Sequence, residues 1–175
     1  FPDDYRISLE SGIIVFRDEF RNKYPYGNLL EFDTEKKEVA HYVRDYWVWG
    51  PGLQAEALPD GDYKVYEKDI RVTTGNTLVF GAAARLNPAF TLERCDGFTL
   101  KDVNIWHCGG MGVIAQRSKD IELNNVNVVP SPGKGRMISI TADATHFVNC
   151  KGFIRMIGCT FMNQKDDATN IHGWS

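Results

Sequence analysis

Residues 94–105 read RCDGFTLKDVNI, and the same pattern returns at residues 117–128 (RSKDIELNNVNV) and residues 149–161 (NCKGFIRMIGCTF). Each segment begins with a polar turn, continues with alternating apolar and polar residues, and ends in a second short β-prone stretch. Phe98 and Ile121 hold the same place in this pattern, 23 residues apart. Phe153 follows 32 residues after Ile121, because the loop signal at residues 130–135 lengthens this interval.

A period in the twenties, with strand alternation and no helical stripe, is typical of a β-solenoid. We therefore predict an all-β fold in which residues 81–175 form coils of a right-handed parallel β-helix. Phe98, Ile121 and Phe153 are predicted to stack as one inward ladder. Leucine-rich repeats share the period but require a Leu-x-x-Leu-x-Leu frame, which this sequence lacks. A β-sandwich would give short strands without the repeated frame.

Residues 1–80 lack this repeat and are predicted to form an antiparallel β-rich region. Short β-prone segments lie at residues 12–16, 46–49 and 63–66, and Pro- and Gly-containing turn signals separate them. An inserted β-barrel is one arrangement that fits this half.

Composition excludes several classes of function. The 175 residues carry a formal net charge of −3 and no basic cluster, which argues against a nucleic-acid surface and a polybasic membrane anchor. No run of about 18 apolar residues occurs, so no membrane-spanning segment is expected. The four cysteines form no Cys-x-x-Cys pair, which disfavours zinc and favours packing as small apolar residues.

The chemistry-bearing pattern lies near the end of the chain. Residues 142–147 (ADATHF) match residues 166–171 (DDATNI), which places Asp143 and Asp167 24 residues apart. One coil separates them, so we expect them on neighbouring strands of one sheet, with Asp166 beside them. Carboxylates this close interact strongly, and one of them is expected to hold a proton near neutral pH, as a general acid paired with a base requires.

Two alternative readings of these aspartates remain open. An Asp-Asp pair before a strand is often a solvated turn or cap. Clustered carboxylates also suit a divalent cation, but no Asp-x-Asp-x-Asp or glycine-rich calcium repeat is present, so we rank cation binding below acid–base chemistry.

Three further polar residues follow the aspartates and are candidates for binding the substrate. His146 aligns with Asn170, and His172 comes two residues later. Each could contact a sugar hydroxyl or serve as a structural hydrogen-bonding group.

Residues 141–147, together with NQKDDATNIHG at residues 163–173, resemble glycoside hydrolase family 110, whose members are bacterial exo-acting α-1,3-galactosidases. The resemblance implies removal of terminal α-1,3-linked galactose, from blood group B-type or linear glycans, with inversion at the anomeric carbon. It implies a β-helix with an inserted antiparallel β-barrel and no metal cofactor. It also implies that Asp143, Asp166 and Asp167 are the catalytic carboxylates.

Two other functions compete with this one. The polygalacturonases have a similar aspartate pattern, but their Asn-Thr-Asp, Gly-Asp-Asp and Gly-His-Gly elements are Thr-Ala-Asp, Lys-Asp-Asp and Ile-His-Gly here. A non-catalytic glycan-binding β-helix module is the third possibility.

The resemblance also sets expectations for the protein's partners and location. We expect a carbohydrate substrate, and secretion or a periplasmic or cell-surface location in a bacterium. The chain is expected to be a fragment of a longer enzyme and to lack part of the sugar pocket, and the sequence leaves open whether the fragment is active on its own. Open coil ends would favour self-association.

Overall fold

The computed structural model describes residues 8–10, 13–16, 26–43, 46–47, 54–60, 63–66, 72–82 and 85–174. Every regular element in these ranges is a β-strand, which confirms the predicted all-β class. The chain divides into two compact units, Phe1–Ala84 and Arg85–Ser175. The predicted boundary at residue 80 and the inserted barrel stay predictions.

No helix in the described ranges is long and apolar enough to cross a membrane.

The described residues of the first unit form eight strands in two antiparallel sheets. One sheet has the order β1-β2-β7-β6, and in the other β3 lies between β4 and β5 and also pairs with β8. The strands are β1 (Ser8–Glu10), β2 (Ile13–Phe16), β3 (Tyr26–Asp33), β4 (Glu38–Val39), β5 (Tyr46–Trp47), β6 (Gln54–Ala57), β7 (Tyr63–Tyr66) and β8 (Thr77–Ala82). Strands thus form in all three β-prone segments, although Gly12, Val48 and Trp49 lie outside the described residues.

Side chains of the paired strands β3 and β8 are prominent among the buried residues described in the first unit. Leu29, Phe32 and Leu78 are fully buried. The turn after β3 is held by Asp33, whose carboxylate accepts hydrogen bonds from the backbone N–H groups of Glu35 (3.0 Å) and Lys36 (2.9 Å). The bond from Lys36 is the main reason that the pKa of Asp33 lies below its ordinary value.

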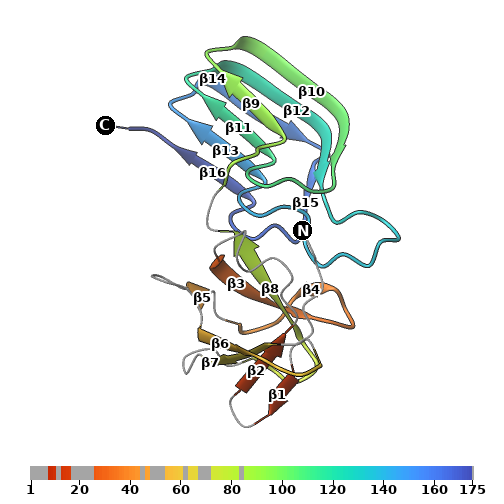
Figure 1. Ribbon diagram of the computed structural model, residues 1–175. Helices are drawn as coiled ribbons and strands as arrows, with labels where there is room; N and C mark the ends of the chain where they lie inside the picture. Colours follow the sequence, from red (N-terminus) through yellow and green to blue (C-terminus); the bar gives the residue numbers. More distant parts are fainter. Residues whose placement is uncertain are drawn as a thin grey trace. The chain divides into compact units, whose positions relative to one another are not determined.

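The second unit is built from two parallel sheets, and successive strands alternate between them except for β14 and β15, which belong to the same sheet. One sheet has the order β16-β13-β11-β9, and the other has the order β10-β12-β14, with β15 also paired to β12. In Figure 1 the arrows of β9, β11, β13 and β16 lie side by side in the first of these sheets. The strands are β9 (Phe90–Glu93), β10 (Asp96–Ile105), β11 (Val113–Gln116), β12 (Lys119–Val128), β13 (Thr145–Val148), β14 (Lys151–Ile157), β15 (Thr160–Phe161) and β16 (Thr169–His172).

Corner residues carry the chain from one sheet to the other at equivalent places. Arg94, Arg117 and Asn149 each have a positive φ, between 49° and 54°. Each also donates its backbone N–H to the neighbouring corner or strand, as Arg117 does to the carbonyl of Val148 at 2.9 Å. Left-handed residues of this kind turn a strand sharply without a long loop. The corners therefore keep consecutive strands aligned, which later places residues such as Asp143 and Asp167 side by side.

The predicted inward ladder is correct for two of its three members. Phe98 pairs with Ile121, but Ile121 pairs with Ile154 and not with Phe153, because the register shifts between Lys119 and Ile121. The Asp120 carboxylate accepts a hydrogen bond from the backbone N–H of Phe153 (3.2 Å), and Gly152 takes up a φ of +69°. This irregularity adds one residue to β14 and leaves Phe153 43% exposed.

The core of the second unit lies between its two sheets. Ile121, Leu123, Val113 and Phe147 are completely buried there. The four cysteines are free and pack against this core, as the sequence predicts for small apolar residues. Burial raises the pKa of the Cys108 thiol, which donates to the carbonyls of Gly110 and Met111.

Candidate active site

Asp143 and Asp167 occupy equivalent places at the entrances of neighbouring strands. Asp143 precedes β13 and Asp167 precedes β16, and these strands pair in parallel with Thr145 opposite Thr169. The backbone N–H of Ala144 donates to the carbonyl of Asp167 at 2.9 Å. The predicted register, in which a step of 24 residues brings the two aspartates together, is therefore confirmed.

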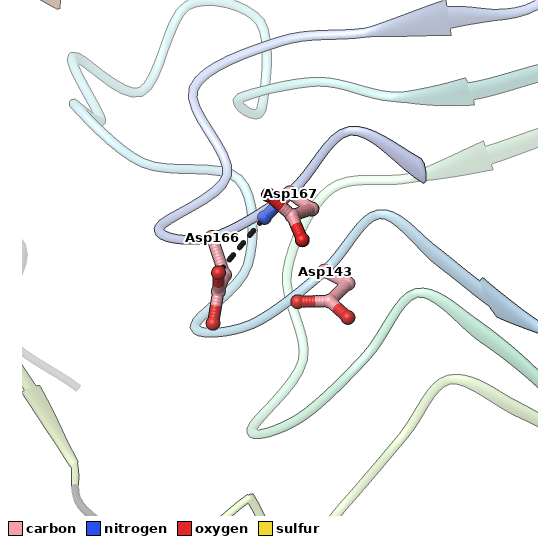
Figure 2. A group of neighbouring side chains, drawn as sticks. All are labelled: Asp143, Asp166 and Asp167. Carbon is pink, nitrogen blue, oxygen red and sulfur yellow. Dashed lines mark hydrogen bonds between the residues drawn. The ribbon is translucent and has the colours of Figure 1, made fainter. Parts of the chain in front are cut away.

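The three aspartates converge on one small volume (Figure 2). One carboxylate oxygen from each of Asp143, Asp166 and Asp167 lies within 4.8 Å of the others. Asp143 is buried, Asp166 is half-buried and Asp167 is exposed. The Asp166 carboxylate also accepts a hydrogen bond from the backbone N–H of Asp167 (3.1 Å). The spacing would suit a cation, but acidic groups of this kind are common without one, and the expectation of no metal stays a prediction.

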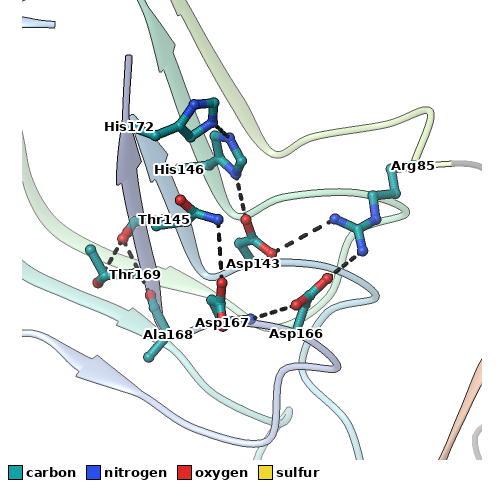
Figure 3. Close-up of polar contacts among 10 residues, drawn as sticks. Arg85, Asp143, Thr145, His146, Asp166, Asp167, Ala168, Thr169 and His172 are labelled. Carbon is teal, nitrogen blue, oxygen red and sulfur yellow. Dashed lines mark hydrogen bonds and ion pairs between the residues drawn. The ribbon is translucent and has the colours of Figure 1, made fainter. Parts of the chain in front are cut away.

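Arg85 supplies positive charge to this group and was not among the predicted site residues. One terminal nitrogen of its guanidinium lies 3.8 Å from Oδ1 of Asp143, and the other pairs with Oδ2 of Asp166 (Figure 3). Arg85 is 81 residues from Asp166 in the sequence, in a segment with no repeat or motif. No pattern in the sequence could have signalled this contact.

His146 and His172 form a hydrogen-bonded chain that ends on Asp143. Nδ1 of His146 bonds Oδ2 of Asp143, and its Nε2 lies 2.9 Å from Nε2 of His172 (Figure 3). A carboxylate only accepts, so with neutral rings His146 donates to Asp143 and His172 donates to His146. The ring of His172 in turn makes an edge contact with Trp174, with centroids 5.7 Å apart.

Asn170 relates to Asp167 as His146 relates to Asp143. Each lies three residues after its aspartate, and Nδ2 of Asn170 donates to Oδ2 of Asp167 at 3.3 Å. His146 and Asn170 are also paired across β13 and β16. These two side chains thus orient the two aspartates. Roles for His146, Asn170 and His172 in substrate binding stay predictions.

Gly112 permits the close approach of the neighbouring strand entrance. Its backbone N–H donates to the carbonyl of Asp143 at 3.0 Å. A Cβ at this position would lie 2.5 Å from the carbonyl oxygen of Ala144, which is backbone and cannot move without shifting Asp143.

We therefore expect Gly112→Ala to destabilise the protein by about 1–3 kcal/mol, as other overpacking substitutions do. Urea denaturation would measure the loss. Gly109→Ala is the control, since its φ lies outside the left-handed region and a Cβ there meets no atom closer than the Asn87 side chain at 3.4 Å. A Gly112 variant as stable as the parent would contradict the close contact.

Comparison of the sequence with curated proteins identifies relatives that match almost the whole chain. α-1,3-Galactosidase A of Shewanella woodyi is 37% identical over 98% of this chain. The chain is homologous to a segment of the α-1,3-galactosidases. α-1,3-Galactosidase B of Bacteroides fragilis and of Phocaeicola vulgatus are 30% and 28% identical, each over 97% of the chain. The resemblance predicted from the sequence is thereby confirmed.

The homologous segment is a minor part of each relative. The chain spans 28% of the length of each of these three α-1,3-galactosidases. No family model matches the chain.

Proposed function

We propose that the chain is the aspartate-bearing part of a glycoside hydrolase that removes terminal α-1,3-linked galactose. The convergence of Asp143, Asp166 and Asp167, in a chain homologous to α-1,3-galactosidases, is the observation that carries this proposal. Blood group B-type and linear α-galactosyl glycans are the proposed substrates. A bacterial origin, with export to the periplasm, the cell surface or the medium, is proposed on the same relatives.

The proposed chemistry needs two carboxyl groups with different tasks. One, in its acid form, gives its proton to the leaving glycosidic oxygen, and another, as carboxylate, takes a proton from the attacking water. The water oxygen then bonds to the anomeric carbon while the bond to the leaving oxygen breaks. Side chains fixed by partners suit such work, because the reacting atoms must be held in line. Asp143 is held by Arg85 and His146, and Asp167 by Asn170.

The proposed fold for Arg85–Ser175 is a right-handed parallel β-helix. The alternation of strands between two parallel sheets and the equivalent corners at Arg94, Arg117 and Asn149 support it. Self-association through the edge strands β14 and β16 is proposed as well, since an unpaired strand edge can accept another strand.

Inversion at the anomeric carbon is proposed on the resemblance and has its own test. Inverting enzymes usually separate their two carboxyl groups by about 6.5–9.5 Å, and retaining enzymes by about 5–5.5 Å. The nearest carboxylate oxygens here lie within 4.8 Å, which is shorter than the usual inverting distance. We expect proton NMR, recorded during the first turnovers, to show β-galactose forming before mutarotation. Initial release of α-galactose would refute inversion and establish retention.

The activity itself is tested by release of free galactose from α-1,3-linked galactosides. Galactosides with α-1,4 or α-1,6 linkages and pectic acid serve as comparisons. Release from the α-1,3-linked substrates supports the proposal. Hydrolysis of pectic acid alone would favour a polygalacturonase-like enzyme, and glycan binding without turnover would favour a non-catalytic module.

A further inference from the structure

The geometry points to Arg85 as a positioning residue that holds Asp143 and Asp166 in a fixed relation to one another. This inference rests on the proposed function, because it assigns Arg85 a task within the same group of aspartates. Neither the sequence pattern nor the homology assigns this residue a role.

The contacts of Arg85 form a bridge between two side chains. Its two terminal nitrogens lie against different carboxylates, 3.8 Å from Oδ1 of Asp143 in one case and in contact with Oδ2 of Asp166 in the other. A bidentate pair would fix one carboxylate alone, whereas this arrangement fixes the relation between two. Arg85 is itself two-thirds shielded from solvent, with 32% of its side chain exposed.

The bridge is needed most at Asp143. Only 3% of the Asp143 side chain is exposed, and a second carboxylate lies close by. A buried carboxylate without a counter-charge is costly, and two carboxylates close together repel each other. The guanidinium of Arg85 offsets both effects. His146 adds a hydrogen bond on the other oxygen of Asp143, so that both oxygens have a partner.

Asp167 stands apart from this bridge. Within the part of the chain that the structure describes, no cationic side chain pairs with it, and the neutral amide of Asn170 orients it. Arg85 therefore links only two of the three aspartates, Asp143 and Asp166. Asp167 is outside this bridge and is free to respond to a substrate.

The backbone around Arg85 is anchored to the strand entrances of the site. Asn87 forms an antiparallel bridge with Gly109, and Ala89 donates its N–H to the carbonyl of Met111 at 3.0 Å. Met111 directly precedes Gly112, whose backbone N–H donates a hydrogen bond to the carbonyl of Asp143. The segment that carries Arg85 is thus tied to the same layer of backbone as Asp143, as a positioning residue requires.

Three variants of the full chain test the inference. Arg85→Ala removes the bridge, Arg85→Lys keeps the charge but cannot span two carboxylates in the same way, and Arg117→Ala removes an exposed arginine paired with Glu93 at 3.2 Å. We expect Arg85→Ala to lower kcat by about 10²-fold through misplacement of the carboxylates, with KM changed less than about twofold, as expected for loss of an interaction made in the transition state. Arg85→Lys should recover part of kcat, and Arg117→Ala should behave as the parent.

A second readout needs no catalysis. The carboxyl ¹³C signals of Asp143 and Asp166, followed by NMR at pH 7, should move in Arg85→Ala while that of Asp167 moves less. Arg117→Ala should leave all three signals in place.

A kcat equal to the parent's in Arg85→Ala, or unmoved Asp143 and Asp166 signals, would overturn the inference. A large rise in KM with kcat unchanged would also overturn it and would make Arg85 a substrate contact. If the longer enzyme that carries this chain releases no galactose, the proposed function fails, whereas the NMR signals still decide whether Arg85 holds the two aspartates.

Discussion

Asp167→Asn is expected to reduce galactose release by about 10²–10⁴-fold, the usual contribution of a positioned acid or base. Asn keeps the shape of the side chain but can neither give up a carboxyl proton nor accept one from water. The site has no obvious substitute, since Asp143 is engaged by Arg85 and His146, and Asp166 by Arg85. Initial rates of galactose release, at saturating substrate, measure the effect.

Asp167 suits this substitution because it is exposed and makes no ion pair with any described residue. Its replacement should leave the thermal unfolding midpoint close to that of the parent, so a loss of rate would not reflect unfolding. Asp102→Asn is the matched control, because Asp102 is also an exposed aspartate of the second unit and its carboxylate accepts a hydrogen bond from an amide side chain, that of Asn125, at 2.8 Å. Full activity in Asp167→Asn would remove this residue from the acid–base chemistry.

Phe147→Ala is expected to cost about 3–5 kcal/mol of unfolding free energy, the range for truncating a large core side chain. Phe147 is completely buried in the core of the second unit and belongs to β13, the strand that begins just after Asp143. Its removal leaves a cavity that the two sheets can close only by moving together. Urea denaturation gives the free energy, and comparison of the slopes shows whether the same surface is exposed in both proteins.

Phe153→Ala is the control for this prediction. Phe153 lies in the same unit but is 43% exposed, and its ring is covered by the guanidinium of Arg155 at 4.7 Å from the ring centre. Its truncation should cost at most about 1 kcal/mol, the value of an exposed cation–π contact. Equal losses in the two variants would contradict the placement of Phe153 outside the core.

The contrast between these phenylalanines shows how far the sequence determined the fold. Alternation and spacing sufficed to pair Phe98 with Ile121, since both segments follow the same frame. They failed at Phe153, where the frame predicts an inward side chain. The Asp120 carboxylate captures the backbone N–H of Phe153, and this local competition shifts the register by one residue. A pattern of apolar residues carries no information about such a bond.

The candidate site divides in the same way. Asp143 and Asp167 could be placed together from the sequence, because backbone pairing at a fixed step brings equivalent residues to adjacent strands. Asp166 followed from its place beside Asp167. Arg85 could not be predicted, since the partners of a long flexible side chain depend on which groups the tertiary fold brings within its reach. The hydrogen bond between His146 and His172 joins rings on neighbouring strands, but their sequence positions do not align, so it was missed as well.

The pairing of β13 with β16 also limits how the site can change in evolution. Strands that are hydrogen-bonded to each other lie about 4.8 Å apart, whatever their side chains. The backbone spacing between the strand entrances that carry Asp143 and Asp167 is therefore set by the hydrogen bonds between β13 and β16. Insertions in the turns between β13 and β16 can vary the walls around a bound sugar while this spacing stays constant.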